Sequence, residues 1–94
     1  MTPSTQTFSS VFNALADTPQ EAANMRARAE LAQALAGLVL AQGWTQAEAA
    51  QRCGVTQPRM NDLLRGRISR FSLDALVNMV VACGQRVRLA LEAA

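Results

Sequence analysis

The stretch that decides the fold is residues 45–66, which read TQAEAAQRCGVTQPRMNDLLRG. Thr45 and Glu48 have the spacing of a capping box, in which the hydroxyl and the carboxylate each satisfy an amide that the first helical turn leaves without a partner. Gly54 is expected to end this helix, because glycine adopts the left-handed backbone conformation of a helix terminus at little cost. Thr56 then caps a second helix. The stretch therefore predicts two short helices joined by a tight turn.

The spacing of small and apolar residues indicates how these two helices meet. Pro58 lies in the first turn of the second helix, where its missing N–H costs nothing, and the helix is expected to run to Arg65 before Gly66 stops it. Ala50 allows a crossing helix to approach closely. The apolar side chains that fill the wedge between the helices are Val55, Met60 and Leu63. This pattern is the sequence form of a helix-turn-helix.

Composition and charge indicate one small helical domain with a basic patch. The chain has 94 residues, of which 50% are apolar, and its nine basic residues are all arginine. In residues 52–70, five arginines against one acid give a local charge of +4, whereas residues 1–51 have two arginines against four acids, a charge of −2. Such a patch is the electrostatic footprint of a protein that binds a phosphate backbone, and an ordinary solvated arginine surface is the alternative.

Two longer helices are predicted around the central pair. The first begins at Asp17-Thr18-Pro19 and runs to Gln42, with Gly43 as its stop, and Gly37 within it is interpreted as a close helix contact. Its core stripe is Leu31, Leu35, Leu38 and Val39, whereas Arg26 and Arg28 are expected to project beyond the domain. The second begins after Ser72 and ends at Gly84, and Phe71 anchors the loop before it. Its buried stripe is Leu73, Leu76, Val77 and Val80.

The two ends of the chain lack the long helical pattern of the central residues. Residues 1–18 are predicted to be partly disordered, with a short amphipathic helix whose apolar face either folds onto its own domain or docks on a partner. That face consists of Phe8, Val11, Phe12 and Leu15. Residues 85–94 read QRVRLALEAA, in which apolar and polar side chains alternate as in a β-strand.

A single strand requires a partner for its backbone groups. Pairing of residues 85–94 with the same segment of a second copy gives a twofold homodimer, and pairing with another protein is the alternative. A helix that continues through this segment is a further alternative, which Gly84 and the β-branched Val87 disfavour.

Several functional classes find no support in the sequence. Cys53 and Cys83 have no neighbouring metal ligand and are expected to be reduced thiols in the core. There is no histidine, no nucleophile–base pair and no glycine-rich phosphate loop, so neither catalysis nor a cofactor is expected. No apolar run reaches the length of a membrane span, and the first ten residues lack the features of a signal peptide, so a cytoplasmic protein is expected.

The second helix of a helix-turn-helix lies in the major groove of double-stranded DNA, and residues near its start reach the base edges. Gln57 is expected to read adenine, Arg59 to fork onto guanine, and Pro58 to contact a thymine methyl. Asn61 is expected to read adenine or to contact a phosphate. Asp62 either accepts from cytosine or holds Arg59 or Arg65 in place. For each residue, a cap or a solvated surface group is the alternative.

Residues 30–84 resemble the DNA-binding unit of Cro and Xre-type phage repressors. By that resemblance, Gln46 and Thr56 contact phosphates at the two helix N-termini, and Arg65, Arg67 and Arg70 reach phosphates beyond them. The resemblance implies an all-α, lambda-repressor-like bundle of four to five helices, to which the alternation in residues 85–94 adds a C-terminal strand paired across a dimer. The expected domains are residues 1–18, a DNA-binding domain at 19–84, and a dimerisation strand at 85–94.

A narrower set of motifs, in the order GWTQAEAA, GVTQPR, LRGR, FSLDAL and RVRL, resembles the HigA-type antitoxins. Two positions depart from that pattern: Cys53 replaces the usual leucine, and Met60 the usual valine or isoleucine. This resemblance implies a repressor of its own operon that neutralises a RelE/HigB-like ribonuclease toxin. A plain Xre-type regulator without a toxin is an alternative, and a protein-interaction module with secondary DNA binding is another.

Overall fold

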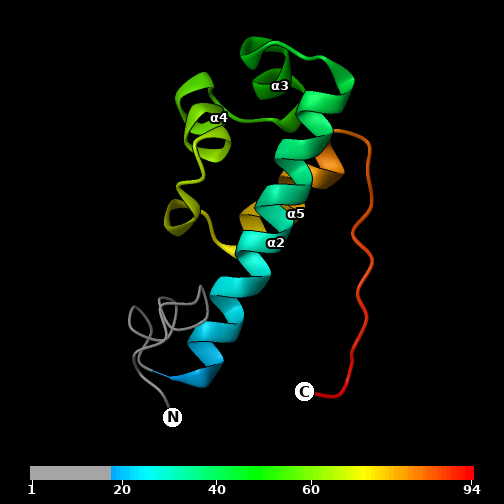
Figure 1. The fold of residues 1–94 in the computed structure, drawn as a ribbon. Coiled ribbons are helices and arrows are strands. Elements are labelled where there is room, and N and C mark those ends of the chain that lie inside the picture. Colours follow the sequence, from blue (N-terminus) through cyan, green and yellow to red (C-terminus); the bar gives the residue numbers. More distant parts are fainter. Residues whose placement is uncertain (1–17) are drawn as a thin grey trace.

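The computed structural model describes residues 18–94, so the helix predicted at Phe8–Leu15 lies outside the described residues. The elements in chain order are α2 (Pro19–Gln42), α3 (Gln46–Cys53), α4 (Gln57–Leu64), the short 3-10 helix η1 (Ile68–Arg70) and α5 (Leu73–Ala82) (Figure 1). All regular elements of residues 18–94 are helical, which confirms the helical fold class.

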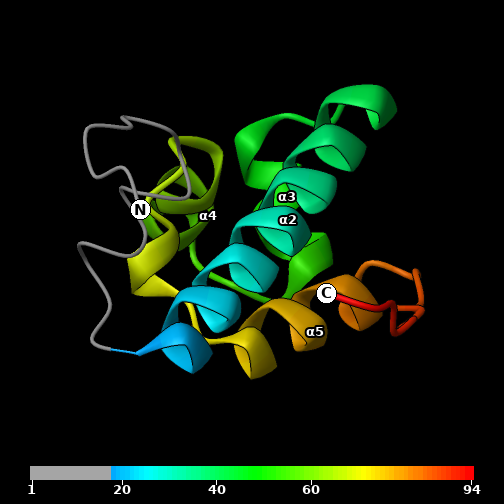
Figure 2. The ribbon, with the colours of Figure 1, turned by 60° about the horizontal axis from the view of Figure 1, so that its bottom comes forward.

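Helix α2 is the long element against which the others pack. Its N-cap is Thr18, whose hydroxyl oxygen accepts from the amide of Glu21 at 3.0 Å, and Pro19 occupies the first turn. It ends at Gly43, which adopts the left-handed conformation with φ 69°. At about 1.5 Å per residue the helix is about 36 Å long, so it spans the domain. Helix α5 lies along α2, and α3 and α4 sit at one end of the pair (Figures 1 and 2).

The central helical pair forms as its sequence predicts. The Thr45 hydroxyl accepts from the amide of Glu48 at 3.1 Å, and the Glu48 carboxylate accepts from the amide of Thr45 at 2.8 Å. The bond from the Thr45 amide lowers the pKa of Glu48 below its ordinary value, because it favours the charged form. Gly54 ends α3 with φ 71°, and Thr56 caps α4. At the end of α4 the amide of Arg65 donates to the main-chain oxygen of Asn61 at 3.0 Å, so short-range contacts set all four ends of the pair.

The core lies where α2, α5 and the α3–α4 pair meet. Ala50, Met60 and Leu63 are buried, which confirms the predicted contact between α3 and α4. The largest fully buried side chains come from α2, α4, α5 and the loop before α5, namely Leu35, Val39, Met60, Phe71 and Leu76. Residues of α2, α4, α5 and the loop before α5 thus belong to one apolar cluster.

The two cysteines meet at the contact between α3 and α5. Cys53 is buried, but Cys83 is only half-buried, so the prediction that both thiols lie in the core is wrong for Cys83. Both are free. Burial, together with a smaller contribution from the adjacent Cys83, raises the pKa of the Cys53 thiol to about 11. Cys53 is therefore a neutral packing group at physiological pH.

One side of the bundle carries a groove that the predicted core stripes did not anticipate. Leu73 and Val77, expected to be buried, are half-buried and line the groove together with Leu31 of α2. Its other wall contains Val87 and Leu89 from the C-terminal segment. The stripe of α5 is only partly covered because no helix of residues 18–94 packs on this flank.

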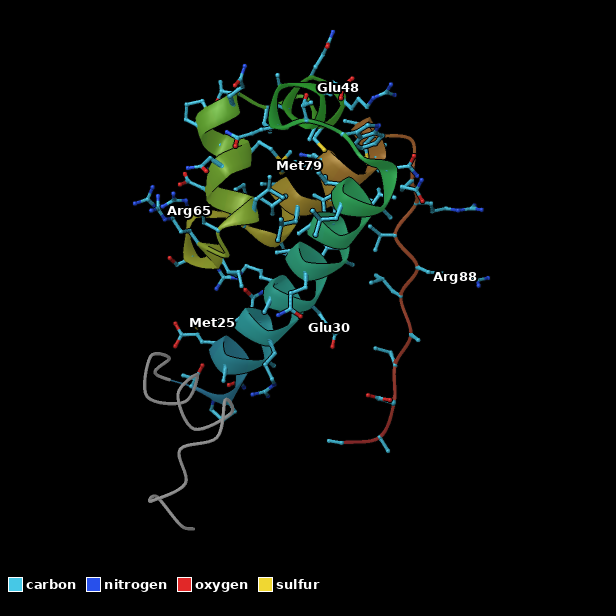
Figure 3. The ribbon with its side chains drawn as sticks, turned by 45° about the horizontal axis from the view of Figure 1, so that its top comes forward. Met25, Glu30, Glu48, Arg65, Met79 and Arg88 are labelled. Atoms are coloured by element: carbon cyan, nitrogen blue, oxygen red, sulfur yellow. The ribbon has the colours of Figure 1, made fainter. Side chains whose placement is uncertain are left out.

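Residues 85–94 follow this groove as an extended segment. Gly84 turns the chain with φ 91°, and the segment then runs beside α2 (Figures 1 and 3). It forms neither a helix nor a hydrogen-bonded strand, so the alternative of a continuing helix is wrong, and the predicted strand has no partner within the described part of this chain. Leu89 and Leu91 are 89% and 101% exposed.

Gly37 makes no close helix contact, contrary to its interpretation from the sequence. A Cβ atom built there meets no atom within 4 Å, whereas a Cβ at Gly54 lies 3.8 Å from that of Ala82. The glycine lines a second hollow beside the groove, between α2 and the start of the C-terminal segment.

None of the helices in residues 18–94 has the length and apolar character needed to span a membrane.

Replacing Gly37 with alanine is expected to stabilise the domain by about 0.5–1 kcal/mol, because alanine loses less backbone entropy in a helix and meets no neighbour. The matched variant Gly43→Ala is expected to destabilise it by about 1 kcal/mol, because its φ of 69° strains any residue with a Cβ. Urea unfolding followed by circular dichroism measures both. A loss of stability for Gly37→Ala would contradict the open space at this position.

Candidate nucleic-acid interface

Helix α4 presents one face to the core and the opposite face to solvent. Met60 and Leu63 are buried between α4 and the bundle. At about 100° per residue, Gln57, Asn61, Pro58 and Arg65 occupy one outward arc about 100° wide. Gln57, Pro58 and Arg65 are exposed, and Asn61 is half-buried. Figure 3 shows Arg65 pointing away from the bundle.

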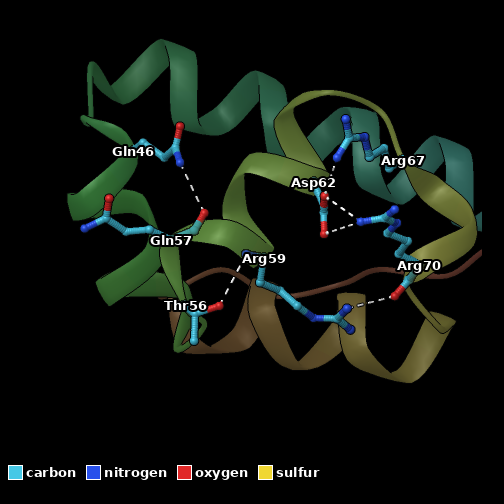
Figure 4. Close-up of polar contacts among 7 residues, drawn as sticks. All are labelled: Gln46, Thr56, Gln57, Arg59, Asp62, Arg67 and Arg70. Atoms are coloured by element: carbon cyan, nitrogen blue, oxygen red, sulfur yellow. Dashed lines mark hydrogen bonds and ion pairs between the residues drawn. The ribbon is translucent and has the colours of Figure 1, made fainter.

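The N-termini of α3 and α4 are tied together by an amide. The Gln46 Nε2 donates to the main-chain oxygen of Gln57 at 3.1 Å (Figure 4). The Thr56 hydroxyl oxygen accepts from the amide of Arg59 at 3.3 Å, which leaves its hydroxyl proton available as a donor. Gln46 likewise keeps a second amide proton. The two predicted phosphate contacts are thus brought to neighbouring helix starts, where the helix dipoles favour an anion.

Arg59 does not extend toward the outward arc as its predicted base contact requires. On α4 it lies about 160° from Gln57 and about 40° from Leu63, on the half of the helix that faces the domain. Its guanidinium lies 4.3 Å from the centroid of the Phe71 ring and donates to the main-chain oxygen of Arg70 at 2.9 Å (Figure 4). The side chain joins α4 to the loop before α5.

Asp62 pairs with arginines other than the two that the sequence suggested. Its carboxylate accepts from Arg67 at 3.0 Å and from Arg70 at 3.2 and 3.3 Å, whereas neither Arg59 nor Arg65 binds it. Partial burial alone raises the pKa of Asp62, but the two arginine hydrogen bonds outweigh it and hold the pKa below its ordinary value. The Asp62 carboxylate is therefore ionised at physiological pH and binds two arginine side chains.

The arginines of the basic stretch are mostly engaged with the domain itself. Arg52 stacks over the Trp44 ring at 4.8 Å, in addition to the three arginines already described. Arg65 is the member of the stretch for whose side chain residues 18–94 provide no hydrogen bond, ion pair or aromatic ring contact. Four arginine side chains of the stretch are thus held by contacts within the domain, and among the described residues Arg65 is the one left without a partner.

Sequence reasoning missed the role of Arg28. This residue was expected to project beyond the domain, but its Nη1 donates to the main-chain oxygen of Phe71 at 3.2 Å. Its Nε is buried without a hydrogen-bond partner. The contact joins residues 43 positions apart, so no local pattern could have indicated it.

Among residues 18–94 no group of acidic, histidine or cysteine side chains has the arrangement of a metal site.

Comparison with protein families agrees with this geometry. A family model described as a helix-turn-helix domain matches residues 14–92, which is well over half of the chain. The chain therefore belongs to this helix-turn-helix domain family, and its fold is that of DNA-binding regulators. A comparison with curated proteins found no match.

Replacing Arg59 with alanine is expected to destabilise the domain by about 1–2 kcal/mol, because it removes both the stacking on Phe71 and the hydrogen bond to the loop. The matched variant Arg65→Ala is expected to change stability by less than about 0.5 kcal/mol, because Arg65 is exposed and unpaired. Urea unfolding measures both. Equal stability of the two variants would contradict a structural role for Arg59.

Proposed function

We propose that the protein is a sequence-specific transcriptional repressor that inserts α4 into the major groove of operator DNA. The observation that carries this proposal is the outward arc of α4, which offers side chains able to read bases next to two helix N-termini able to hold phosphates. In this proposal the protein binds DNA in the cytoplasm and neither catalyses a reaction nor uses a cofactor.

The outward arc supplies the proposed base contacts. Gln57 is the adenine reader at the start of α4, with Asn61 one turn further and Pro58 against a thymine methyl. Arg59 would have to leave the Phe71 ring to reach a guanine. We therefore propose that Arg59 does not read a base and instead positions α4 against the loop before α5. Asp62 is likewise not proposed to read a base, because its carboxylate oxygens already accept hydrogen bonds from arginines.

The proposed phosphate contacts flank this arc. Gln46 and Thr56 hold one phosphate at the paired helix starts, where each retains a proton to donate. Arg65 reaches a second phosphate from the end of α4, and Arg67 keeps 43% of its side chain exposed for a third. These contacts set the register of α4 on the duplex and carry no sequence information.

Gln57→Ala is expected to weaken binding to operator DNA by about 1–3 kcal/mol, the discrimination supplied by one good bidentate pair. Gln33→Ala, which removes an exposed glutamine from α2, is the control and is expected to leave affinity unchanged. A gel shift on the DNA upstream of the coding sequence, repeated at several salt concentrations, measures both. Absence of any salt-dependent binding by the unaltered chain would favour the protein-interaction module.

We further propose that the working unit is a twofold dimer paired through residues 85–94. The segment is extended, it exposes apolar side chains, and its backbone has no ladder partner in the described chain. In an antiparallel pair centred on Leu89, Leu89 faces its own copy and Val87 faces Leu91. Arg86 then faces Glu92 on the other side of the ribbon, so apolar and charged pairs both match.

Neighbouring registers match less well. A pair centred on Arg88 places two arginines directly opposite each other, which destabilises a strand pair. A pair centred on Ala90 faces Leu89 with Leu91 and Arg88 with Glu92, but it sets Val87 against the smaller Ala93. The side chains therefore disfavour the register centred on Arg88. Of the other two we propose the one centred on Leu89, in which Val87 meets a leucine, and either yields two copies of α4 related by a twofold axis.

In a chain with Cys53→Ala and Cys83→Ser, Leu89→Cys is expected to form a disulfide-linked dimer under mild oxidation, because directly opposite residues come within disulfide reach. Ala90→Cys is the control, since in this register its own copy is a diagonal neighbour about 7–8 Å away. Denaturing gel electrophoresis without reductant measures the yield. Sedimentation that finds an unchanged dimer after deletion of residues 85–94 would contradict the pairing.

We also propose that the repressor is the antitoxin of a toxin–antitoxin operon. What supports this is the resemblance of the motif order to HigA-type antitoxins, with a RelE/HigB-like toxin as the partner. A plain regulator without a toxin shares the DNA-binding features. The neighbouring gene distinguishes the two: a small basic ribonuclease-like reading frame favours the antitoxin, and its absence favours the plain regulator.

A further inference from the structure

The strongest polar cluster on the α4 side of the molecule is built around an acid. The Asp62 carboxylate binds Arg67 at 3.0 Å and Arg70 at 3.2 Å (Figure 4). The Asp62 side chain is only 15% exposed, whereas those of Arg67 and Arg70 are 43% and 57% exposed. The carboxylate is thus covered by the two cations, which themselves remain open to solvent.

The position of this acid ties the loop to α4. In addition to the carboxylate contacts, the main-chain oxygen of Asp62 accepts from the amide of Arg67 at 2.9 Å. Arg70 in turn offers its main-chain oxygen to Arg59, so the loop is held from both sides. The two arginine side chains are therefore oriented relative to the same helix whose outward arc carries the proposed base readers.

This arrangement affects two kinds of DNA complex to different extents. Binding to arbitrary sequences depends on charge alone, and the carboxylate reduces the charge of the cluster from +2 to +1. Binding to the operator sets α4 in one register, in which arginines already oriented lose little conformational freedom when they meet phosphates. The carboxylate thus weakens unspecific complexes more than the specific one.

We propose that Asp62 is a specificity-determining residue, which restrains Arg67 and Arg70 so that the chain discriminates against DNA of arbitrary sequence. The inference rests on the proposed function and deepens it, because it assigns to an acid on α4 a role in partner selection that involves no base contact. It acts through the two arginines, and it is thus a positioning residue.

The test compares the unaltered full chain with Asp62→Asn, which keeps the shape of the side chain and removes its charge. Affinities are measured for two duplexes of equal length and composition, one with the DNA upstream of the coding sequence and one with the same bases shuffled. For the shuffled duplex, Asp62→Asn is expected to bind several-fold more tightly. The slope of log K against log salt concentration is expected to steepen by about 0.9, the equivalent of one more phosphate contact.

For the upstream duplex the gain is expected to be smaller, so the ratio of the two affinities falls. Glu30→Gln is the matched control: it removes the same charge from an exposed site on α2 that borders the groove. It is expected to leave the ratio unchanged. In a background with Arg67→Gln and Arg70→Gln, Asp62→Asn is expected to have less effect, because no arginine remains to be released.

An unchanged or higher affinity ratio for Asp62→Asn would overturn the inference, as would equal effects with and without the two arginines. Circular dichroism and urea unfolding of each variant separate these outcomes from loss of fold. If the unaltered chain binds neither duplex, the proposed function itself fails and the inference fails with it. If the unaltered chain prefers the upstream duplex and the ratio does not fall, only the role of Asp62 is rejected.

Discussion

The burial of Phe71 is the interaction on which the remaining arrangement depends. Its ring is 1% exposed, and the Arg59 guanidinium of α4 stacks on it. Its main-chain oxygen accepts from Arg28 of α2. One residue therefore links the helix proposed to enter DNA, the loop before α5 and the long helix that supports the domain. Because these contacts come from three directions, the orientation of α4 relative to α2 is set by packing as well as by the turn at Gly54.

The same packing decides which charges of the basic stretch are available to DNA. Arg52 and Arg59 lie on aromatic rings, and Arg67 and Arg70 share the carboxylate of Asp62. A count of arginines treats these side chains as equivalent, but in the folded domain they have different partners and are not equally available to DNA. The proposed interface consequently combines a few accessible donors with an internal counter-ion, an arrangement suited to selecting a sequence over merely attracting phosphate.

At the C-terminal segment, in contrast, the described residues leave apolar surface uncovered. Residues 85–94 lie beside the groove between α2 and α5 with Leu89 and Leu91 in solvent. An extended segment whose backbone has no ladder partner among the described residues, beside an apolar groove, is the feature on which the proposed pairing with a second copy rests. The proposed dimer would thereby give the two copies of α4 a fixed separation, which a single domain does not have.

The sequence by itself determined the α-helices of the described residues, their N-caps and the contact between α3 and α4, but not the short helix η1, which was expected to be a loop. These features depend on residues within four positions of each other, such as Thr45 with Glu48, or on a repeating apolar pattern, so local rules suffice. Only the tertiary structure decided the partners of the arginines, the openness around Gly37 and the exposure of Leu73. Arginine side chains are long and reach many acceptors, so their partners depend on which distant segments pack nearby, as with Arg28 and Phe71, 43 residues apart. Local sequence patterns carry no information about such choices.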